Sequence, residues 1–301
     1  MYSRVPMTLA GTLAGLICAG LAAAQQQDFS QIEFRTEPVA DGIYLLQGTG
    51  GNIGVLTGPD GVILIDDEYT QLGDKLAAAV AAISDAPLRL VIDTHWHFDH
   101  TGGNAKLGRE GAIIVAHENV RERMSKPFVF EFLGTEVPAS PPEALPVVTF
   151  TDAVSLHLNG QTLSVMHVPN AHTDGDAIIF FEPANVVHMG DTFFNGFYPF
   201  IDYQSGGGIR GMVAAIDRAL PKIDADTRII PGHGPLARRA ELVEFRDMLH
   251  TVARRLQGML DDGMSTEQII AAKPTAEFDG KWGGGFLPPD RWVDLVLRGM
   301  R

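Results

Sequence analysis

The chain has 301 residues, of which 45% are hydrophobic and 20% charged, a composition that excludes intrinsic disorder over most of its length. Its formal net charge of −14 at pH 7 leaves little to gain from counterion release, so nucleic acid is not an expected partner. The one cysteine, Cys18, lies near the N-terminus, so histidines and carboxylates must build any metal site in the rest of the chain.

Residues 1–24 have the pattern of a secretory signal peptide. Arg4 supplies the positive start, Met7–Leu21 is apolar, and Ala22–Ala24 offers a cleavage site of small residues. The apolar run is short for a membrane span, which takes about 20 residues, although an uncleaved anchor is the alternative. We therefore expect a periplasmic or secreted protein without a membrane anchor after cleavage, with residues 25–301 as its single domain.

Short apolar runs between glycine-rich turns predict three antiparallel strands at 42–46, 52–56 and 62–65. The next expected elements are a helix at 70–84, strands at 88–92 and 112–116, and a helix at 118–125.

Residues 126–146 contain five prolines, which exclude a long helix, and an apolar group at Phe128, Phe130 and Phe132. We interpret this segment as an irregular flap, or equally as a loop that packs on the core.

The second half of the chain repeats this order of elements. Asn159-Gly160 predicts a hairpin between strands at 154–158 and 162–168. The later expected elements are strands at 177–181, 186–189 and 227–231, and helices at 207–220, 238–260 and 288–300. Each half thus has strands followed by a helix and a strand. Two sheets that bury their apolar faces together, with helices outside, form a four-layer α/β/β/α sandwich of the α/β class.

Three of the ten histidines lie within six positions. His95, His97, Asp99 and His100 directly follow the expected strand at 88–92. Side chains at the carboxyl end of a strand are where open α/β folds place their sites. Imidazole nitrogens and a carboxylate suit zinc, whereas the alternative is a histidine cluster on the surface.

Three distant residues have a similar setting. His172, Asp191 and His233 each lie just past an expected strand, next to glycine or proline. Loops of this kind bring side chains together at one edge of a sheet. With the first group they make seven candidate ligands, which is enough for two metal ions.

In these residues the sequence resembles the metallo-β-lactamase superfamily. The match is His95-x-His97-x-Asp99-His100, then His172, Asp191 and His233 in the family's order and spacing, within roughly residues 36–250. The resemblance implies the ligand sets His95, His97 and His172 for a first metal, Asp99, His100 and His233 for a second, and Asp191 as the bridge.

The resemblance also implies a chemistry. Two zinc ions would share a hydroxide that attacks a carbonyl or phosphoryl centre, with iron or manganese not excluded by the ligand types. It implies that Asp99 orients the hydroxide, so Asp99 and Asp191 are the catalytic candidates. Asp66 and Asp67 end a strand at the same edge, and one of them could hold the free nitrogen of a ligating histidine; the alternative is a turn carboxylate.

The sequence specifies the substrate less closely than it specifies the superfamily. The commonest zinc β-lactamases carry Cys at the place of Asp191 and Lys where this chain has Phe194. The resemblance is closer to the thioesterases, lactonases and phosphodiesterases of the superfamily, which carry Asp at the position of Asp191. We expect a secreted dinuclear zinc hydrolase that opens an amide or ester bond of a small molecule, with weak or promiscuous β-lactam hydrolysis. The alternatives are a lactone or phosphodiester hydrolase and a non-catalytic periplasmic metal or redox accessory protein.

Three residues are candidate substrate contacts. Phe194 and Tyr198 belong to the aromatic run of residues 193–200, which either packs in the core or lines an apolar cleft. Arg210 follows Gly206–Gly208 and is a candidate contact for an anion.

Overall fold

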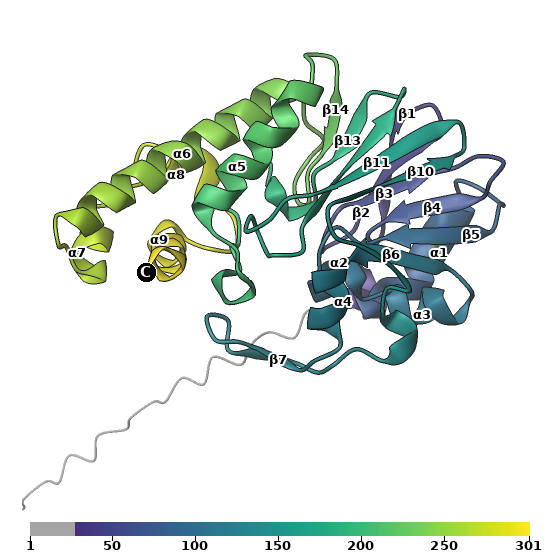
Figure 1. Ribbon diagram of the computed structural model, residues 1–301, viewed down its shortest axis with the longest axis horizontal. Helices are drawn as coiled ribbons and strands as arrows, with labels where there is room; N and C mark the ends of the chain where they lie inside the picture. The colour runs from purple at the N-terminus through teal and green to yellow at the C-terminus, as the bar shows by residue number, and fades with distance from the viewer. Residues whose placement is uncertain (1–27) are drawn as a thin grey trace, which may run out of the picture. The chain divides into compact units, whose positions relative to one another are not determined.

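Two β-sheets carry the fold of residues 32–301 (Figure 1). The computed structural model describes residues 28–301, so the predicted signal peptide at residues 1–24 lies outside the described residues. The strands of the first sheet, in spatial order, are β1 (Arg35–Ala40), β2 (Ile43–Gln47), β3 (Ile53–Leu56), β4 (Val62–Ile65), β5 (Leu88–Ile92), β6 (Ile113–His117) and β9 (Val148–Phe150). Those of the second are β10 (Ala153–Leu158), β11 (Gln161–His167), β12 (Ala177–Glu182), β13 (Val186–His188) and β14 (Arg228–Ile230).

Helices follow the strands in both halves of the chain. The α-helices are α1 (Gly73–Ala81), α2 (Phe98–Thr101), α3 (Asn104–Arg109), α4 (Glu118–Met124), α5 (Ile209–Ala219), α6 (Arg239–Asp261), α7 (Thr266–Ala271), α8 (Asp279–Trp282) and α9 (Pro289–Met300). The short 3-10 helices are η1 (Phe29–Gln31), η2 (Thr70–Leu72), η3 (Pro142–Ala144), η4 (Gly190–Thr192), η5 (Tyr203–Ser205) and η6 (Leu220–Lys222). None of the helices described in residues 28–301 is long and apolar enough to cross a membrane.

Apolar side chains divide the fold into four layers. Ile43 and Ile63 of the first sheet pack with Phe181 of the second in one buried core. Leu76 of α1 and Leu107 of α3 join a separate core on the outer face of the first sheet. Helices α5 and α6 lie beyond the second sheet (Figure 1), where their buried side chains form a third core. The predicted α/β/β/α sandwich is confirmed.

Strand directions place the candidate ligands at one edge of each sheet. Strands β1 to β4 are antiparallel, which confirms the expected meander, whereas β4, β5, β6 and β9 run parallel. In the second sheet β10 to β13 are antiparallel and β14 lies parallel to β13. Parallel strands end at the same edge of a sheet, so the loops after β4 and β5 are neighbours, as are those after β13 and β14.

The segment at 126–146 is more ordered than a flap of irregular backbone. It contains the antiparallel hairpin of β7 (Phe128–Phe130) and β8 (Thr135–Val137). The ring of Phe130 stacks on that of Trp96, with 5.3 Å between centroids. Apolar packing therefore fixes the hairpin beside the histidine-rich loop.

Candidate metal centre

Four buried side chains form a first cluster of ligand atoms. His95 and His97 come from the loop after β5, His172 from the loop after β11, and Asp191 from η4 after β13. One ligand atom of each lies within 4.8 Å of all the others. His172 Nε2 lies 2.9 Å from His97 Nδ1 and 3.3 Å from Asp191 Oδ2. Three imidazoles and one carboxylate match the donors that zinc takes in proteins.

Asp99, His100 and His233 form a second cluster beside the first. Asp99 and His100 lie on α2, and His233 follows β14. Nε2 of His233 lies 3.3 Å from both Asp99 Oδ2 and His100 Nε2. The side chains of Asp99 and His233 are 18% and 19% exposed, whereas the first cluster is almost fully buried. The two clusters are therefore open to solvent on the side of Asp99 and His233.

Asp191 faces both clusters. Its Oδ2 atom points to His172 of the first cluster, and its Oδ1 atom lies 3.2 Å from His100 Nε2 and 3.5 Å from His233 Nε2 of the second. A carboxylate that turns one oxygen to each of two ligand sets has the arrangement of a bridging ligand.

Hydrogen bonds fix the tautomers of two histidines in the first cluster. His172 Nδ1 lies 2.8 Å from the carbonyl oxygen of Phe200, and His97 Nε2 lies 3.0 Å from Asp202 Oδ2. Both partners only accept, so these two nitrogens carry the hydrogens. The lone pairs of His172 Nε2 and His97 Nδ1 then face each other at 2.9 Å. Two lone pairs at this distance repel each other, and a bound cation removes the repulsion.

Asp66 orients the other two buried histidines. Its Oδ2 atom accepts from His100 Nδ1 at 2.7 Å and from the Thr94 hydroxyl at 2.8 Å. Since this hydroxyl is the donor to Asp66, it accepts from Nδ1 of His95 at 3.0 Å. Nδ1 is thereby occupied on both rings, and Nε2 is the nitrogen that faces the ligand clusters. The prediction that Asp66 or Asp67 would hold a ligating histidine is confirmed for Asp66, whereas Asp67 accepts from the backbone of Gly103 instead.

Two further observations show that the residues fit metal ions. His95 Nε2 is buried and has no hydrogen-bond partner among the described residues. A Cβ at Gly51 would lie 2.2 Å from Cε1 of His100, and one at Gly232 would lie 2.0 Å from Asp191 Oδ1. Glycines thus keep the space around the ligand atoms open, and an unpartnered buried nitrogen such as His95 Nε2 is costly unless an ion pairs with it.

The clusters differ in charge. Burial lowers the pKa of His95 well below its ordinary value and that of His172 to about 4, so both rings are neutral at pH 7. In the second cluster burial also lowers the pKa, but the carboxylates of Asp191 and Asp99 together outweigh it, joined at His100 by that of Asp66. The pKa of His100 is raised well above its usual range and that of His233 to about 9. Without metal, the second cluster therefore holds protons that the first lacks.

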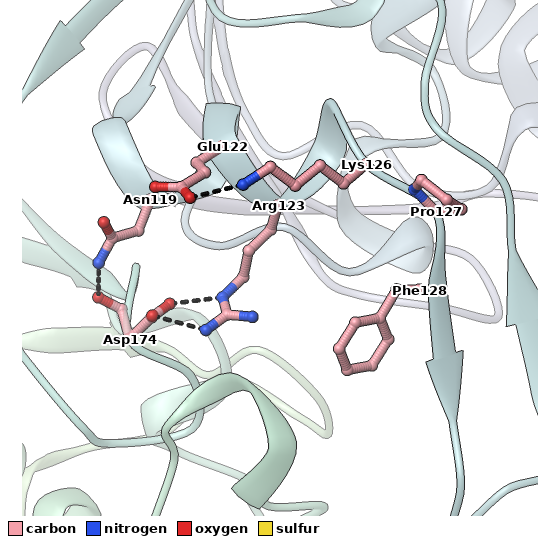
Figure 2. Close-up of a pocket in the computed structure, with 7 residues that line it drawn as sticks. All are labelled: Asn119, Glu122, Arg123, Lys126, Pro127, Phe128 and Asp174. Atoms are coloured by element: carbon pink, nitrogen blue, oxygen red, sulfur yellow. Dashed lines mark hydrogen bonds and ion pairs between the residues drawn. The ribbon is translucent and has the colours of Figure 1, made fainter.

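A polar network ties the loop of His172 to α4 (Figure 2). Arg123 donates to both carboxylate oxygens of Asp174 at 2.7 and 2.6 Å, and Asn119 donates to its carbonyl oxygen. Asp176 accepts from the backbone N–H groups of His172 and Thr173. Asn119, Arg123 and Asp174 line a neighbouring hollow of about 200 Å³, and its charged side chains are paired with each other. The network positions His172 and forms no part of the ligand set.

The three candidate substrate contacts lie in different surroundings. The ring of Phe194 is buried and stacks on that of His233, with 5.1 Å between centroids. Tyr198 stacks on Trp292, and its hydroxyl donates to Asp279, so it belongs to the core around α8 and α9. Arg210 donates to Gln257 of α6 and lines a groove between α5 and α6. The structure thus brings only Phe194 to the ligand clusters, because core packing holds Tyr198 and the α5–α6 contact holds Arg210.

Sequence reasoning missed one carboxylate that binds a candidate ligand and one that holds a neighbouring loop. Asp202 binds His97 from 105 residues away. Glu68 is buried at the end of the loop after β4 and accepts from the backbone N–H groups of Thr49 and Gly50. No spacing signal marks either residue, because each meets its partner only through the tertiary fold.

Known proteins resemble the chain in sequence and in fold. A family model described as the metallo-beta-lactamase superfamily matches residues 46–233, a range that contains all seven candidate ligands. A hydroxyacylglutathione hydrolase from Polaromonas sp. (strain JS666) is 23% identical over 210 residues, covering 69% of this chain and 72% of the relative. The acyl-coenzyme A thioesterase MBLAC2 from Bos taurus is 25% identical over 230 residues, covering 65% and 79%. The solved structure of DIM-1 metallo-beta-lactamase has a TM-score of 0.59 at 18% identity, covering 73% of this chain and 99% of that one.

Proposed function

This chain belongs to the metallo-beta-lactamase superfamily and is a metallo-hydrolase, and from that premise we propose that it cleaves ester or thioester bonds of a small molecule with two zinc ions. His95, His97 and His172 would hold one ion, Asp99, His100 and His233 would hold the other, and Asp191 would bridge them. The observation that carries the proposal is the pair of oxygens of Asp191, one directed to each cluster. Histidine nitrogen and aspartate oxygen are donors that suit zinc.

The chemistry is the transfer of an acyl group to water. Bound at these residues, the ions would supply an activated water at neutral pH and polarise the carbonyl oxygen of the substrate. Oδ2 of Asp99 lies at the more exposed side of the site and can accept a hydrogen bond from the attacking water. Asp66 and Asp202 would hold the rings of His100 and His97 in place, since each accepts a hydrogen bond from a ring nitrogen.

The choice of ester and thioester bonds rests on the names of related proteins. Two curated relatives are named for hydroxyacylglutathione hydrolysis and for acyl-coenzyme A thioester hydrolysis. The carbon–sulfur or carbon–oxygen bond of such substrates breaks as water adds to the carbonyl carbon, and the released thiol or alcohol takes up a proton. A protein nucleophile is not needed for this reaction.

We propose slow β-lactam opening as a side activity. A strained lactam carbonyl undergoes the same attack by water. Phe194 stands where a lysine would hold the carboxylate of the drug, and its ring is stacked on His233. The ion-pair partners of Asp99 and Asp191 among the described residues are histidines. No lysine or arginine is therefore paired with these two carboxylates, where it could hold the carboxylate of a β-lactam. Binding of the drug would therefore be poor, and the turnover low.

Export to the periplasm or the medium is part of the proposal. It rests on the N-terminal sequence, with Arg4, the apolar run and Ala22–Ala24. Mass spectrometry of the protein from a secreting host would give a mature N-terminus at Gln25. A chain that keeps residues 1–24 in the cytoplasm would contradict it.

Turnover by the zinc-loaded protein tests the function. The substrates are S-lactoylglutathione, a series of p-nitrophenyl esters and a chromogenic cephalosporin, each with and without a chelator. We expect chelator-sensitive turnover of an ester or thioester, and cephalosporin turnover at least about a hundredfold lower in kcat/KM. The matched variants are Asp191→Asn at the site and His157→Ala, which alters an exposed histidine of β10.

Each outcome separates the alternatives. Loss of turnover in Asp191→Asn but not in His157→Ala supports the two-metal site. Two bound metals without turnover of any ester, thioester or lactam would overturn the proposal and favour an accessory protein. Cephalosporin as the best substrate would make the chain a β-lactamase.

A further inference from the structure

A groove between helices α5 and α6 lies outside the metal centre. The two helices lie side by side (Figure 1), and the groove between them has a volume of about 490 Å³, within the range of binding sites for small molecules. Its lining includes Arg210 of α5 and His250 and Arg254 of α6. The proposed hydrolysis uses none of these three residues.

The two arginines in the groove have no acidic partner. Among the described residues, the side chain of Arg210 donates only to the amide oxygen of Gln257, at 2.6 Å, and that of Arg254 has no ion pair or hydrogen bond. By contrast Arg255, the next residue of α6, pairs with Glu277. The chain as a whole has a net charge of −14. Two guanidinium groups that share a groove without a carboxylate therefore leave positive charge for an anion from solution.

Helical spacing places the two guanidinium groups near each other. Arg254 and Gln257 are three residues apart on α6, so their side chains lie on the same face of the helix. Arg210 reaches this face from α5 through its hydrogen bond to Gln257. His250 lies one turn before Arg254 on the same face. The groove thus presents planar groups of N–H donors from two helices, and such groups bind phosphate oxygens in parallel pairs of hydrogen bonds.

The groove also has an apolar part. Val213 of α5 is half-buried and Ala253 of α6 is buried, and both line it. The one carboxylate of its lining is that of Asp261, which accepts from Gln257. Asp261 lies seven residues beyond Arg254, about 10 Å along the axis of α6. The groove therefore combines two cations with an apolar surface, and its single acidic group lies toward the end of α6.

We propose that this groove binds a small organic phosphate, with the phosphate monoester on Arg210 and Arg254 and the organic part over Val213 and Ala253. A phosphate monoester carries nearly two negative charges at neutral pH, which matches two unpaired cations. A carboxylate carries one charge and engages one guanidinium group, so it would use the pair less fully. None of these four residues is a candidate metal ligand, and the inference does not depend on the proposed hydrolysis.

Calorimetric titration of the zinc-loaded protein tests the inference. The probes are phenyl phosphate, benzoate and inorganic phosphate. We expect one equivalent of phenyl phosphate to bind in a manner that depends on the two arginines. Benzoate lacks the second charge and inorganic phosphate lacks the apolar part, so each should bind about tenfold more weakly.

Two arginine variants and a matched control locate the binding. Arg210→Gln and Arg254→Gln each remove one guanidinium group from the groove, whereas Arg35→Gln removes an exposed one from β1. We expect affinity for phenyl phosphate to fall at least about tenfold in the first two variants, as is usual for a lost hydrogen bond to a charged group, and less than about twofold in the control. All three should keep their zinc content and circular dichroism spectrum.

Vesicles distinguish a soluble phosphate from a lipid headgroup. The phosphate of phosphatidylglycerol is a diester with one charge, so it matches the two cations less well than a monoester does. We expect no sedimentation of the protein with vesicles of this lipid. Sedimentation that is lost in Arg254→Gln would overturn the choice of a soluble ligand.

The other outcomes are also decisive. No binding of phenyl phosphate by the unaltered protein would overturn the inference. Binding that is unchanged in both arginine variants would overturn it as well, because the phosphate would then lie on the zinc ions or elsewhere on the surface. Equally tight binding of benzoate would overturn the phosphate monoester, and equally tight binding of inorganic phosphate would overturn the apolar part. None of these results requires ester turnover, so failure of the proposed function is distinguished from failure of this site.

Discussion

The Oδ1 atom of Asp191 lies 3.2 Å from Nε2 of His100, while its Oδ2 atom lies 3.3 Å from Nε2 of His172. His100 and His172 belong to different ligand clusters. The two clusters are therefore joined through one carboxylate. Loss of this carboxylate affects both sites, whereas loss of any other ligand removes a donor from one.

Asp191→Asn keeps the shape of the side chain and removes its charge. We expect fewer than two metal ions per chain and a fall in kcat/KM of at least about a hundredfold. Loss of a residue that only supports a ligand lowers metal affinity or activity by up to about a hundredfold, and Asp191 is itself a candidate ligand. Elemental analysis and turnover measure both effects, and circular dichroism reports the fold. Asp279→Asn is the control, because Asp279 accepts from Tyr198 in the core. Full metal content in Asp191→Asn would contradict the bridging role.

Gly51→Ala should remove the second site selectively. The added Cβ would lie 2.2 Å from Cε1 of His100, so this ring must leave its position against Asp66. We expect one bound ion instead of two and at least a roughly tenfold loss of kcat/KM. Gly258→Ala in α6 meets no atom within 4 Å and should keep both ions, with stability up to about 1 kcal/mol higher. Two tightly bound ions in Gly51→Ala would show that the site does not need this space.

Asp202→Asn tests the partner of His97. The asparagine can still accept a hydrogen bond but no longer carries the charge that orients and polarises the ring. We expect the affinity for the first ion to fall about 10- to 100-fold, as is usual for such partners. Competition with a chromogenic chelator measures the affinity, and Asp202→Glu should restore part of it. An unchanged affinity would mean that Asp202 only caps η5, where it accepts from Ser205.

Metal binding should depend on pH differently at the two sites. The pKa of His233 is about 9 and that of His100 is also raised, so a metal must displace protons from the second cluster at neutral pH. The pKa of His95 is lowered and that of His172 is about 4, so the rings of both are free to bind above about pH 5. As pH falls from 9 to 6, affinity for the second ion should fall about tenfold per unit for each displaced proton.

Calorimetric titration in buffers of different ionisation enthalpy counts these protons. We expect proton release with the second equivalent of zinc and much less with the first. Equal release with both equivalents would contradict the difference in charge between the clusters.

The fold and the ligand positions were accessible from the sequence for a physical reason. Short apolar runs such as Val62–Ile65 are β-strands because both of their faces are buried, and the turn at Asn159-Gly160 adopts the positive φ angles that these residues tolerate. His95, His97, Asp99 and His100 are close in sequence, so a single loop and α2 bring them together. Spacing alone was therefore informative for this group.

The supporting residues depend on tertiary contacts that local sequence does not encode. Asp202 binds His97, and the carbonyl oxygen of Phe200 binds His172. Both partners come from the loop after η4, which is distant in sequence from these histidines. Tyr198, two residues before Phe200, points instead into the core, where its ring stacks on Trp292. The aromatic run thus divides between core and site, and only packing decides which ring goes where. Arg210 lies at the N-terminal end of α5, whose contact with α6 determines its partner.

Anomalous diffraction at the zinc edge from crystals of the metal-loaded chain tests the central claim most directly. We predict two zinc peaks, one among His95, His97 and His172 and one among Asp99, His100 and His233, with an oxygen of Asp191 directed at each. A single peak at saturating zinc, or two peaks with Asp191 turned away from one of them, would contradict the shared two-metal site.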